Sequence, residues 1–266
     1  MRKVSILRSI RKIYQYFVDV PIKEGKVLND RYEVLRVIGT GSYGIFYRCK
    51  DLKTNEIRGL KQLRPSKHHN KKEVALFENE ITVLRSTNHK NMPVLMDTFF
   101  NNAYLFYVMN FIEGDNLEDL IFHKRVSFNE EESLLLIADL LKLVDYLHCM
   151  DIYHGDLRIP NILLKDGQPY LIDFGLSKQG ISMDSASSYE MKQQDHYDLG
   201  EILLYLLYTT YPSKNKKALP WTEELTIKKE TVHLLKRLLQ VKESYSTISE
   251  ISTDVQTALQ ADEGIH

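Results

Sequence analysis

The sequence predicts an α+β fold of two lobes, a small β-rich lobe with one helix and a larger α-helical lobe. Between residues 32 and 112, short hydrophobic runs rich in β-branched and aromatic residues alternate with polar residues, which is typical of strands. Between residues 113 and 260, hydrophobic residues recur every three or four positions over longer runs, which is typical of helices. With 266 residues, the chain is long enough to bury a substantial core. We therefore expect one lobe over 32–112 and the other over 113–260.

The first lobe is expected to contain five strands and one helix. Asn101-Asn102 favours a turn between the last two strands. The helix is expected at Glu73–Ser86, because hydrophobic residues from Val74 to Leu84 fall on one of its faces. The expected strands are Tyr32–Ile38, Ile45–Asp51, Glu56–Leu63, Pro93–Phe100 and Tyr104–Phe111.

The second lobe is expected to contain five helices. The acidic run that follows Asn129 is typical of a helix N-terminus, where negative charge is favourable. His148 falls on the apolar face of that helix, so we expect it to be packed and not catalytic. The serines between residues 182 and 188 are candidates for autophosphorylation in a segment expected to be a flexible loop. The expected helices are Leu117–Phe122, Glu130–Cys149, Asp195–Tyr208, Glu230–Gln240 and Ile248–Gln260.

Residues 1–20 form a separate segment. Hydrophobic residues recur there at intervals of three and four, and Arg and Lys cover the rest of the turn, so we expect a basic amphipathic helix that ends before Pro21. Such a helix either lies on an anionic membrane surface or docks its apolar side onto the main domain. Both alternatives stay open from the sequence.

Composition excludes several classes of protein. The formal net charge of −1 argues against nucleic-acid binding through bulk electrostatics. The two cysteines, Cys49 and Cys149, have no metal-ligand spacing and cannot form a disulfide framework, which favours a reducing compartment. No hydrophobic run is long enough to span a bilayer. We therefore expect a cytoplasmic protein.

The richest motif is the run His154-Gly155-Asp156-Leu157-Arg158-Ile159-Pro160-Asn161, followed twelve positions later by Asp173-Phe174-Gly175. It holds one carboxylate able to orient a hydroxyl nucleophile, and an amide and a second carboxylate able to share a divalent cation. Phosphoryl transfer from a nucleotide needs this combination of groups. An Asp in a loop is usually a turn residue, so the weight of the motif depends on what precedes it.

A glycine-rich run, Gly39-Thr40-Gly41-Ser42-Tyr43-Gly44, lies between the first two expected strands. A dinucleotide-binding turn would require a helix after it, so that interpretation is rejected. A glycine-rich hairpin lets backbone N–H groups approach phosphates closely, because no Cβ atoms intervene. A plain hairpin turn is the alternative, and the run alone does not decide between the two.

Lys61 lies in the third expected strand, seventeen residues after Gly44. A lysine in a strand usually faces solvent at a sheet edge. Glu80, on the following helix, is a candidate partner, and Glu78 competes with it. We expect Glu80 to be the partner, because it lies closer to the apolar face of the helix and points inward. A Lys–Glu ion pair that directs the ammonium toward nucleotide phosphates is required in protein kinases.

These motifs together resemble the protein kinase family over roughly residues 32–260, in the family's order and near its spacings. The resemblance implies a two-lobed kinase fold that takes ATP between its lobes. It implies that Asp156 orients the acceptor hydroxyl, that Lys61 paired with Glu80 contacts the phosphates, and that Arg158 adds positive charge near the transferred group. By the same resemblance, Asn161 and Asp173 ligate Mg²⁺ or Mn²⁺, and Leu84, Leu95, His154 and Phe174 form a hydrophobic column. The implied ATP-binding residues are Gly39, Thr40, Gly41, Ser42, Gly44, Phe46, Gly59, Lys61, Met109, Asn110, Ile112, Asn116 and Leu163.

The chain also departs from the family pattern. Gly155 stands where the family usually has an Arg that reads a phosphate on the activation segment, so we expect activity that is constitutive or controlled from elsewhere. Nineteen residues separate Gly175 from Asp195, and no Ala-Pro-Glu occurs among them. Tyr245 stands where the Arg partner of that Glu would be. Joint loss avoids a buried unpaired charge, which indicates a compact and consistent variant.

We therefore expect an ATP-dependent serine/threonine protein kinase of compact bacterial type that transfers the γ-phosphate to a protein hydroxyl and autophosphorylates. A small-molecule phosphotransferase is the nearest alternative, because the segment after Asp173-Phe174-Gly175 is short. A non-catalytic nucleotide-binding module is less favoured, since Lys61, Asp156 and Asp173 are all present. The expected partners are ATP and a protein substrate, with no nucleic acid; membrane contact through residues 1–20 stays open, and the oligomeric state is not predicted.

Overall fold

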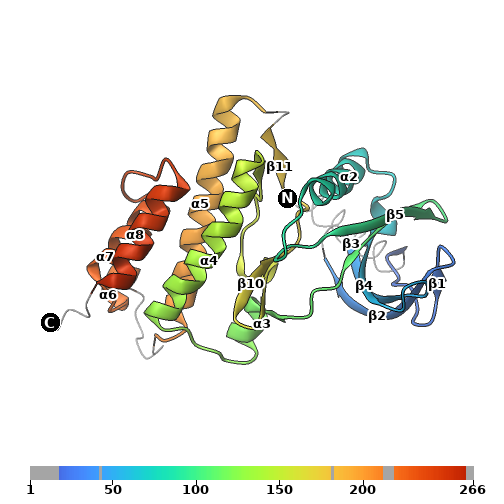
Figure 1. Cartoon of the computed structure of the whole chain (residues 1–266), viewed down its shortest axis with the longest axis horizontal. Coiled ribbons are helices and arrows are strands. Elements are labelled where there is room, and N and C mark those ends of the chain that lie inside the picture. The colour runs from blue at the N-terminus through green and yellow to red at the C-terminus, as the bar shows by residue number, and fades with distance from the viewer. Residues whose placement is uncertain (1–17, 42–43, 181–182, 212–218, 262–266) are drawn as a thin grey trace, which may run out of the picture. The chain divides into compact units, whose positions relative to one another are not determined.

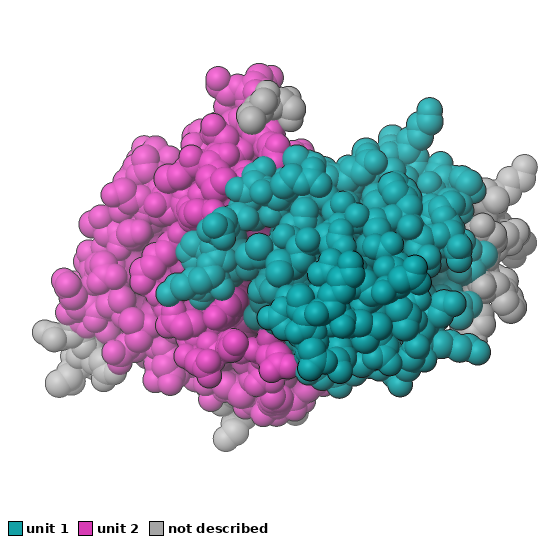
Figure 2. Space-filling view, turned by 45° about the vertical axis from the view of Figure 1, so that its right-hand side comes forward, with its two compact units in different colours: residues 1–112 teal, residues 113–266 magenta. Residues whose placement is uncertain are grey.

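The computed structural model describes residues 18–41, 44–180, 183–211 and 219–261. The chain divides into two compact units, Met1–Ile112 and Glu113–His266, drawn in teal and magenta in Figure 2. The first unit is rich in strands and the second in helices, so the predicted α+β fold is confirmed. The predicted amphipathic helix of residues 1–20 falls almost entirely outside the described residues.

Unit 1 contains a six-stranded antiparallel sheet in the order β1-β2-β3-β4-β6-β5 (Figure 1). One face carries a cluster of buried side chains from several strands, among them Tyr32, Tyr47 and Phe106. The ring of Phe99 stacks on Tyr32 on one side and on Phe106 on the other, with centroids 5.7 and 5.2 Å apart. The strands are β1 Val27–Leu28, β2 Tyr32–Thr40, β3 Gly44–Asp51, β4 Ile57–Leu63, β5 Leu95–Asn101 and β6 Tyr104–Asn110.

Helix α2, Lys71–Ser86, follows the short 3-10 helix η1, Pro65–Lys67. The Asn70 side chain accepts a hydrogen bond from the backbone N–H of Lys72, which satisfies one of the free donors at the helix start. Phe77 of α2 packs against Tyr107 of β6 with ring centroids 5.1 Å apart. The inward face of α2 is thereby fixed against the sheet.

Unit 2 is built around α4, Glu130–Cys149, which packs against α5, Ser185–Tyr208, and α8, Ile248–Gln260 (Figure 1). Asn129 and Glu132 form a capping box at the start of α4, where the acidic run predicts a helix N-terminus. The other helices are α3 Leu117–Phe122, α6 Trp221–Glu224, α7 Lys229–Leu238 and the 3-10 helix η2 Ile159–Asn161. The strands are β7 Asp115–Asn116, β8 Ile152–Tyr153, β9 Ile162–Lys165, β10 Gln168–Leu171 and β11 Lys178–Gln179.

The bounds predicted for α3, α4 and α8 are confirmed, and those of α7 differ by one or two residues. The prediction of a flexible loop at the activation-segment serines is wrong for Ser185, Ser187 and Ser188. These three serines lie in α5, which begins ten residues before the predicted start and is capped by Asp184. Ser182 lies outside the described residues. Among the described helices, none is long and apolar enough to cross a membrane.

Candidate active site

Lys61 and Glu80 form an ion pair inside unit 1. Lys61 Nζ lies 2.7 Å from Oε1 and 2.9 Å from Oε2 of Glu80. The side chains are 12% and 3% exposed, respectively, so water screens the pair weakly. Glu78 lies on the exposed face of α2. The lysine of β4 is therefore paired with Glu80, the partner expected from the helix face.

The glycine-rich run connects β2 to β3. Gly39 and Thr40 end β2, Gly44 begins β3, and the N–H of Gly41 donates to the carbonyl of Gly44 at 2.9 Å. A Cβ on Gly44 would lie 2.8 Å from the Gln62 carbonyl and 3.2 Å from Cγ of Lys61. The absence of a side chain at Gly44 therefore lets β3 approach the strand that carries Lys61. Ser42 and Tyr43 lie outside the described residues.

Three residues predicted at the adenine end lie together on the sheet of unit 1. Gly59 of β4 lies next to the side chains of Phe46 of β3 and Met109 of β6. A Cβ on Gly59 would lie 2.8 Å from Cζ of Phe46 and 3.3 Å from Cγ of Met109. The bare backbone at Gly59 thus makes room for these two side chains. Asn110 ends β6, where its side-chain oxygen accepts from the N–H of Val94 at 2.6 Å, and Ile112 is the last residue of the unit.

In unit 2, Asp156 and Asn161 are held together by the amide of Asn161. Its Nδ2 donates to the Asp156 carbonyl at 2.9 Å and to the carboxylate oxygen Oδ2 at 3.0 Å. Asn161 closes η2 and is 7% exposed, so the amide that aims Asp156 is fixed by the fold. Arg158 immediately precedes η2 and its side chain is exposed.

Asp173 follows the strand pair β9–β10. The backbone N–H of Ile172 donates to the carbonyl of Asn161 at 3.0 Å, which brings the Asp173 segment next to the Asn161 backbone. Asp173 has a φ of 62°, and its Oδ1 accepts from the N–H of Gly175 at 3.3 Å. Phe174 is fully buried, and its ring lies 5.1 Å from that of His154. Within unit 2, two members of the predicted hydrophobic column are therefore in contact.

Two further predicted nucleotide contacts, Asn116 and Leu163, lie on neighbouring strands. Asn116 of β7 pairs in register with Leu163 of β9. The Asn116 side chain accepts from the N–H of Glu118 at 2.8 Å and donates to the Pro160 carbonyl at 2.7 Å. The amide oxygen thus caps α3, and the amide nitrogen ties α3 to η2. The sequence did not predict this structural role.

The backbone on either side of Asp156 is anchored to α5 by two buried carboxylates. Asp195 accepts from the N–H groups of His154 and Gly155 at 3.0 and 2.8 Å. His148 lies 2.9 Å from the same carboxylate, so it is packed as predicted. Asp198, which the sequence did not single out, accepts from the N–H of Leu157 at 3.2 Å. These bonds hold both sides of Asp156.

Burial controls the charge states of Asp198 and His154. The pKa of Asp198 is raised to about 7, mainly because burial desolvates the carboxylate; a hydrogen bond from Gln194 opposes this shift, and the nearby Asp195 carboxylate adds to it. Burial also lowers the pKa of His154, with the carboxylates of Asp195, Asp173 and Asp156 acting in the opposite direction. The imidazole of His154 is therefore neutral at pH 7 and suited to packing against Phe174.

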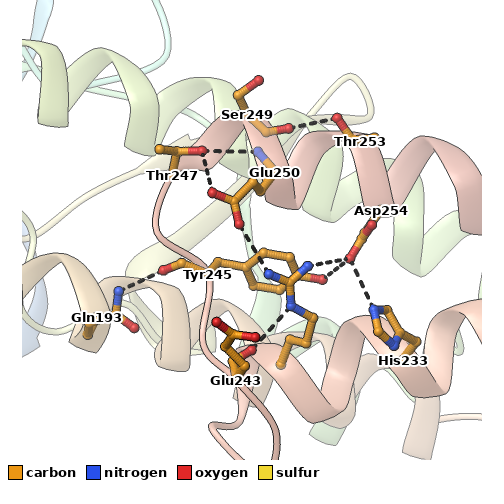
Figure 3. A network of polar contacts seen from close by, with 10 residues as sticks. Gln193, His233, Glu243, Tyr245, Thr247, Ser249, Glu250, Thr253 and Asp254 are labelled. Carbon is orange, nitrogen blue, oxygen red and sulfur yellow. Dashed lines mark hydrogen bonds and ion pairs between the residues drawn. The ribbon is translucent and has the colours of Figure 1, made fainter.

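Two departures from the kinase pattern, at Gly155 and at Tyr245, are explained by the contacts around these residues. Gly155 has a φ of 71°, and a Cβ there would lie 2.9 Å from Cε of Met191 and 3.0 Å from the Leu176 carbonyl. At Tyr245, the backbone carbonyl accepts from Nε2 of Gln193 at 2.7 Å (Figure 3). A neutral hydrogen bond thus ties α5 to the loop that precedes α8.

The Tyr245 side chain is buried within a polar network of α7 and α8 (Figure 3). Its hydroxyl donates to Asp254 at 2.5 Å, and the guanidinium of Arg237 lies 3.8 Å from its ring centroid. Arg237 also pairs with Asp254 and Glu250, both at 3.1 Å. Tyr245 therefore stabilises this end of the unit without the Glu–Arg pair that the family usually has.

The residues present fit a divalent cation of the magnesium type. Among the described residues, no group of three or more His, Cys, Asp or Glu is arranged to hold a metal ion. A site made of Asn161 and Asp173 needs no such group, because Mg²⁺ takes few protein ligands and completes its shell with water and substrate phosphates. Since Nδ2 of Asn161 donates to Asp156, its Oδ1 is the atom available to a cation.

Comparisons with known proteins agree with these motifs. Residues 32–194 match the protein kinase domain. The chain is 41% identical over 253 residues to the probable serine/threonine-protein kinase YbdM of Bacillus subtilis, covering 95% of this chain and 99% of that protein. It is 34% identical over 158 residues to the RAC serine/threonine-protein kinase of Drosophila melanogaster, which is 59% of this chain and 26% of that protein.

A solved structure shares the fold. The kinase domain of PknI from Mycobacterium tuberculosis matches with a TM-score of 0.69, covering 90% of this chain and all of that domain at 19% identity. The match to the protein kinase domain ends at residue 194, within α5.

Proposed function

Because the chain belongs to the protein kinase family and is a serine/threonine protein kinase, we propose that its motifs carry the roles the family assigns to them. Lys61, oriented by Glu80, contacts the α- and β-phosphates of ATP, and the glycine-rich run approaches the phosphates with its backbone. Phe46, Gly59, Met109 and Leu163 accommodate the adenine, which hydrogen-bonds to the backbone of Asn110 and Ile112. The observation that carries this proposal is the 2.7 Å ion pair of Lys61 with Glu80.

Asp156 orients the hydroxyl of the protein acceptor and receives its proton, and the Asn161 amide fixes the direction of the carboxylate. Arg158 places positive charge near the transferred phosphate. Asn161 and Asp173 hold Mg²⁺ or Mn²⁺, which neutralises negative charge on the phosphates. Catalysis depends mainly on positioning and electrostatics, because phosphoryl transfer has a loose transition state.

A phosphate-transfer assay with two kinds of acceptor distinguishes a protein kinase from a small-molecule phosphotransferase. Purified chain, γ-labelled ATP and either Mg²⁺ or Mn²⁺ are incubated with generic protein acceptors and, separately, with a panel of small hydroxylated metabolites. Label on protein serine or threonine, including the chain itself, supports the proposal. Label on metabolites alone would move the acceptor to the small-molecule class. Comparing the two metals identifies the one that supports turnover.

We also propose a cytoplasmic location, which the two free cysteines support. Peripheral membrane contact through residues 1–20 is a separate proposal, which rests on the basic amphipathic pattern of the sequence. Co-sedimentation with vesicles that contain anionic lipid, compared between the full chain and a chain without residues 1–17, tests it. Binding that is lost with the segment supports membrane contact, and equal sedimentation of both chains contradicts it.

A further inference from the structure

Asp19 lies before the region that matches the protein kinase domain, yet it is bound to the glycine-rich run through one intermediate residue. Its carboxylate oxygen Oδ2 lies 3.0 Å from Nη1 of Arg64, and Nε of Arg64 donates to the carbonyl of Gly41 at 2.7 Å. Arg64 directly follows β4, three residues after Lys61. A single guanidinium therefore connects the N-terminal segment to the run that we propose for phosphate binding.

The Asp19 side chain is 4% exposed and its position is fixed by several donors. Oδ1 accepts from the N–H of Ser66 at 2.8 Å, and Oδ2 accepts from the Ser66 hydroxyl at 2.9 Å. A carboxylate that is buried to this degree is stable only when it is paired and hydrogen-bonded. The pair with Arg64 satisfies that requirement and limits the guanidinium to one orientation, because its planar fork must face both Asp19 and Gly41.

The segment that carries Asp19 is fixed to the sheet at a second place. The N–H of Ile22 donates to the hydroxyl of Tyr47 at 3.1 Å, and that hydroxyl donates to Oε1 of Gln62 at 2.7 Å. Tyr47 is fully buried. Further along, the N–H of Gly25 donates to the Val34 carbonyl at 2.8 Å. Asp19 is thus held by a strap, residues 19–26, that is bound along the sheet.

At the other end of this connection, the backbone of Gly41 is held on both sides. Its N–H donates to the Gly44 carbonyl, and its own carbonyl accepts from Arg64. Glycine has the widest choice of φ and ψ, so an unheld Gly41 would lose the most conformational entropy on binding a nucleotide. Holding the carbonyl in advance lowers that entropy cost.

We propose that Asp19 and Arg64 are positioning residues for ATP binding: Arg64 holds the glycine-rich run at Gly41, and Asp19 holds Arg64. The inference rests on the proposed phosphate-binding role of the glycine-rich run. Among the described residues, the hydrogen-bond partners of the Asp19 side chain are Arg64 and Ser66, so Asp19 acts on the run through Arg64. The pair affects the affinity for ATP and leaves the chemical step, which depends on Asp156 in unit 2, nearly unchanged.

The test is a double-mutant cycle of Asp19→Asn and Arg64→Gln, measured as kcat and as KM for ATP. Each single variant is expected to raise KM by about three- to tenfold, the effect of one lost hydrogen bond, with kcat changed less than twofold. The double variant is expected to match Arg64→Gln alone, since Asp19 acts through Arg64. Additive effects, or an unchanged KM in Arg64→Gln, would overturn the proposal.

Two control variants separate positioning from stability. Asp51→Asn removes a carboxylate that is similarly buried in unit 1 and is bonded to Arg31 at 2.8 and 2.6 Å and to the N–H of Lys53. Asp51 lies at the opposite end of β3 from Gly44 and the glycine-rich run. It is expected to lower the thermal midpoint at least as much as Asp19→Asn while leaving KM for ATP unchanged. Ser66→Ala removes only one donor to Asp19, so it is expected to keep KM within twofold of wild type.

Hydrogen exchange of the free protein supplies a readout that does not depend on activity. Peptides that cover Gly41 are expected to exchange faster in Arg64→Gln and Asp19→Asn than in wild type, and to be unchanged in Asp51→Asn. Equal exchange in all four proteins would refute the positioning role even if the kinase is active. Faster exchange in these two variants, together with a wild-type protein that transfers no phosphate, would instead retain the connection and reject the proposed function.

Discussion

Nδ2 of Asn161 lies 3.0 Å from Oδ2 of Asp156 and 2.9 Å from the Asp156 backbone carbonyl. One amide therefore fixes both the carboxylate and the backbone of the residue proposed to orient the acceptor. The bond also decides the orientation of Asn161 itself, because an amide that donates through its nitrogen must present its oxygen elsewhere. Metal binding and acceptor positioning are therefore linked through a single side chain.

Replacing Asn161 by Ala is expected to lower kcat by about 100-fold or more, since it removes the orientation of the proposed base and one proposed metal ligand together. Activity at saturating ATP is measured over a range of Mg²⁺ concentrations. Asn116→Ala serves as the control, because that amide also supports η2 but binds the Pro160 carbonyl instead of Asp156. The predicted contact of Asn116 with the nucleotide affects KM for ATP, which does not enter a rate measured at saturating ATP. An equal loss of kcat in both variants would show that Asn161 acts only on the fold.

Lys61→Met is expected to abolish turnover and to leave the protein folded, because it removes the ammonium that is proposed to contact the phosphates. Glu80→Gln is expected to reduce kcat/KM for ATP by about ten- to 100-fold, since the neutral amide holds Lys61 less firmly. Glu78→Gln, on the exposed face of the same helix, is the matched control and is expected to behave as wild type. Circular dichroism checks the fold. Unfolding of Lys61→Met would assign that lysine to structure.

Gly155→Arg is expected to destabilise the protein and not to introduce control by phosphorylation. Its φ of 71° costs a residue with a side chain about 1–2 kcal/mol, and the Cβ would also collide with Met191. Urea unfolding measures the loss of stability.

Replacing Ser185, Ser187 and Ser188 together by Ala is expected to leave the reaction rate at the wild-type value, since Gly155 provides no positive charge to receive a phosphate. A large loss of rate in the triple variant would contradict constitutive activity.

Asp198 is expected to make stability depend on pH. Its folded pKa of about 7 is raised above the ordinary value of 3.8, so the folded state binds the proton more tightly than the unfolded state. This contribution to stability is present below about pH 4 and is lost as the pH rises through about 7. Asp198→Asn keeps an acceptor for Leu157 without a charge. It is expected to gain on the order of 1–3 kcal/mol relative to wild type between pH 4 and 8.

The comparison of Asp198→Asn with wild type is made by urea unfolding at each pH. Buried histidines titrate in the same range: burial lowers the pKa of His196 to about 4, so both proteins lose stability as the pH falls below about 6.5. That loss is common to both and cancels in the difference. A difference that stays constant from pH 4 to 8 would show that Asp198 is ionised throughout.

Local patterns in the sequence predicted most of the elements. The bounds of α4 follow from the Asn129 cap and an uninterrupted hydrophobic period, and Glu80 is distinguished from Glu78 by helix periodicity alone. The start of α5 could not be found in this way, because residues 185–194 carry little hydrophobic periodicity. Strands such as β8 and β11 contain two residues each, which is too short for any period to show.

Contacts between distant segments were the part that the sequence could not supply. Asp198 and Leu157 are 41 residues apart, Gln193 and Tyr245 are 52 apart, and Asp19 and Arg64 are 45 apart. No motif predicts any of these three contacts, so only the fold brings the residues together. Asn116 shows the same limit. The resemblance to the family implies that it contacts the nucleotide, whereas its capping of α3 and its bond to Pro160 follow only from the tertiary structure.

The central claim is that the γ-phosphate of ATP is transferred to a protein hydroxyl that Asp156 orients. Phosphoamino-acid analysis tests this claim most directly. A generic protein acceptor is incubated with γ-labelled ATP and Mg²⁺ in the presence of wild type or of Asp156→Asn. The account predicts labelled phosphoserine or phosphothreonine with wild type and none above background with Asp156→Asn. Equal labelling by both proteins, or none by a folded wild type that binds ATP, would contradict it.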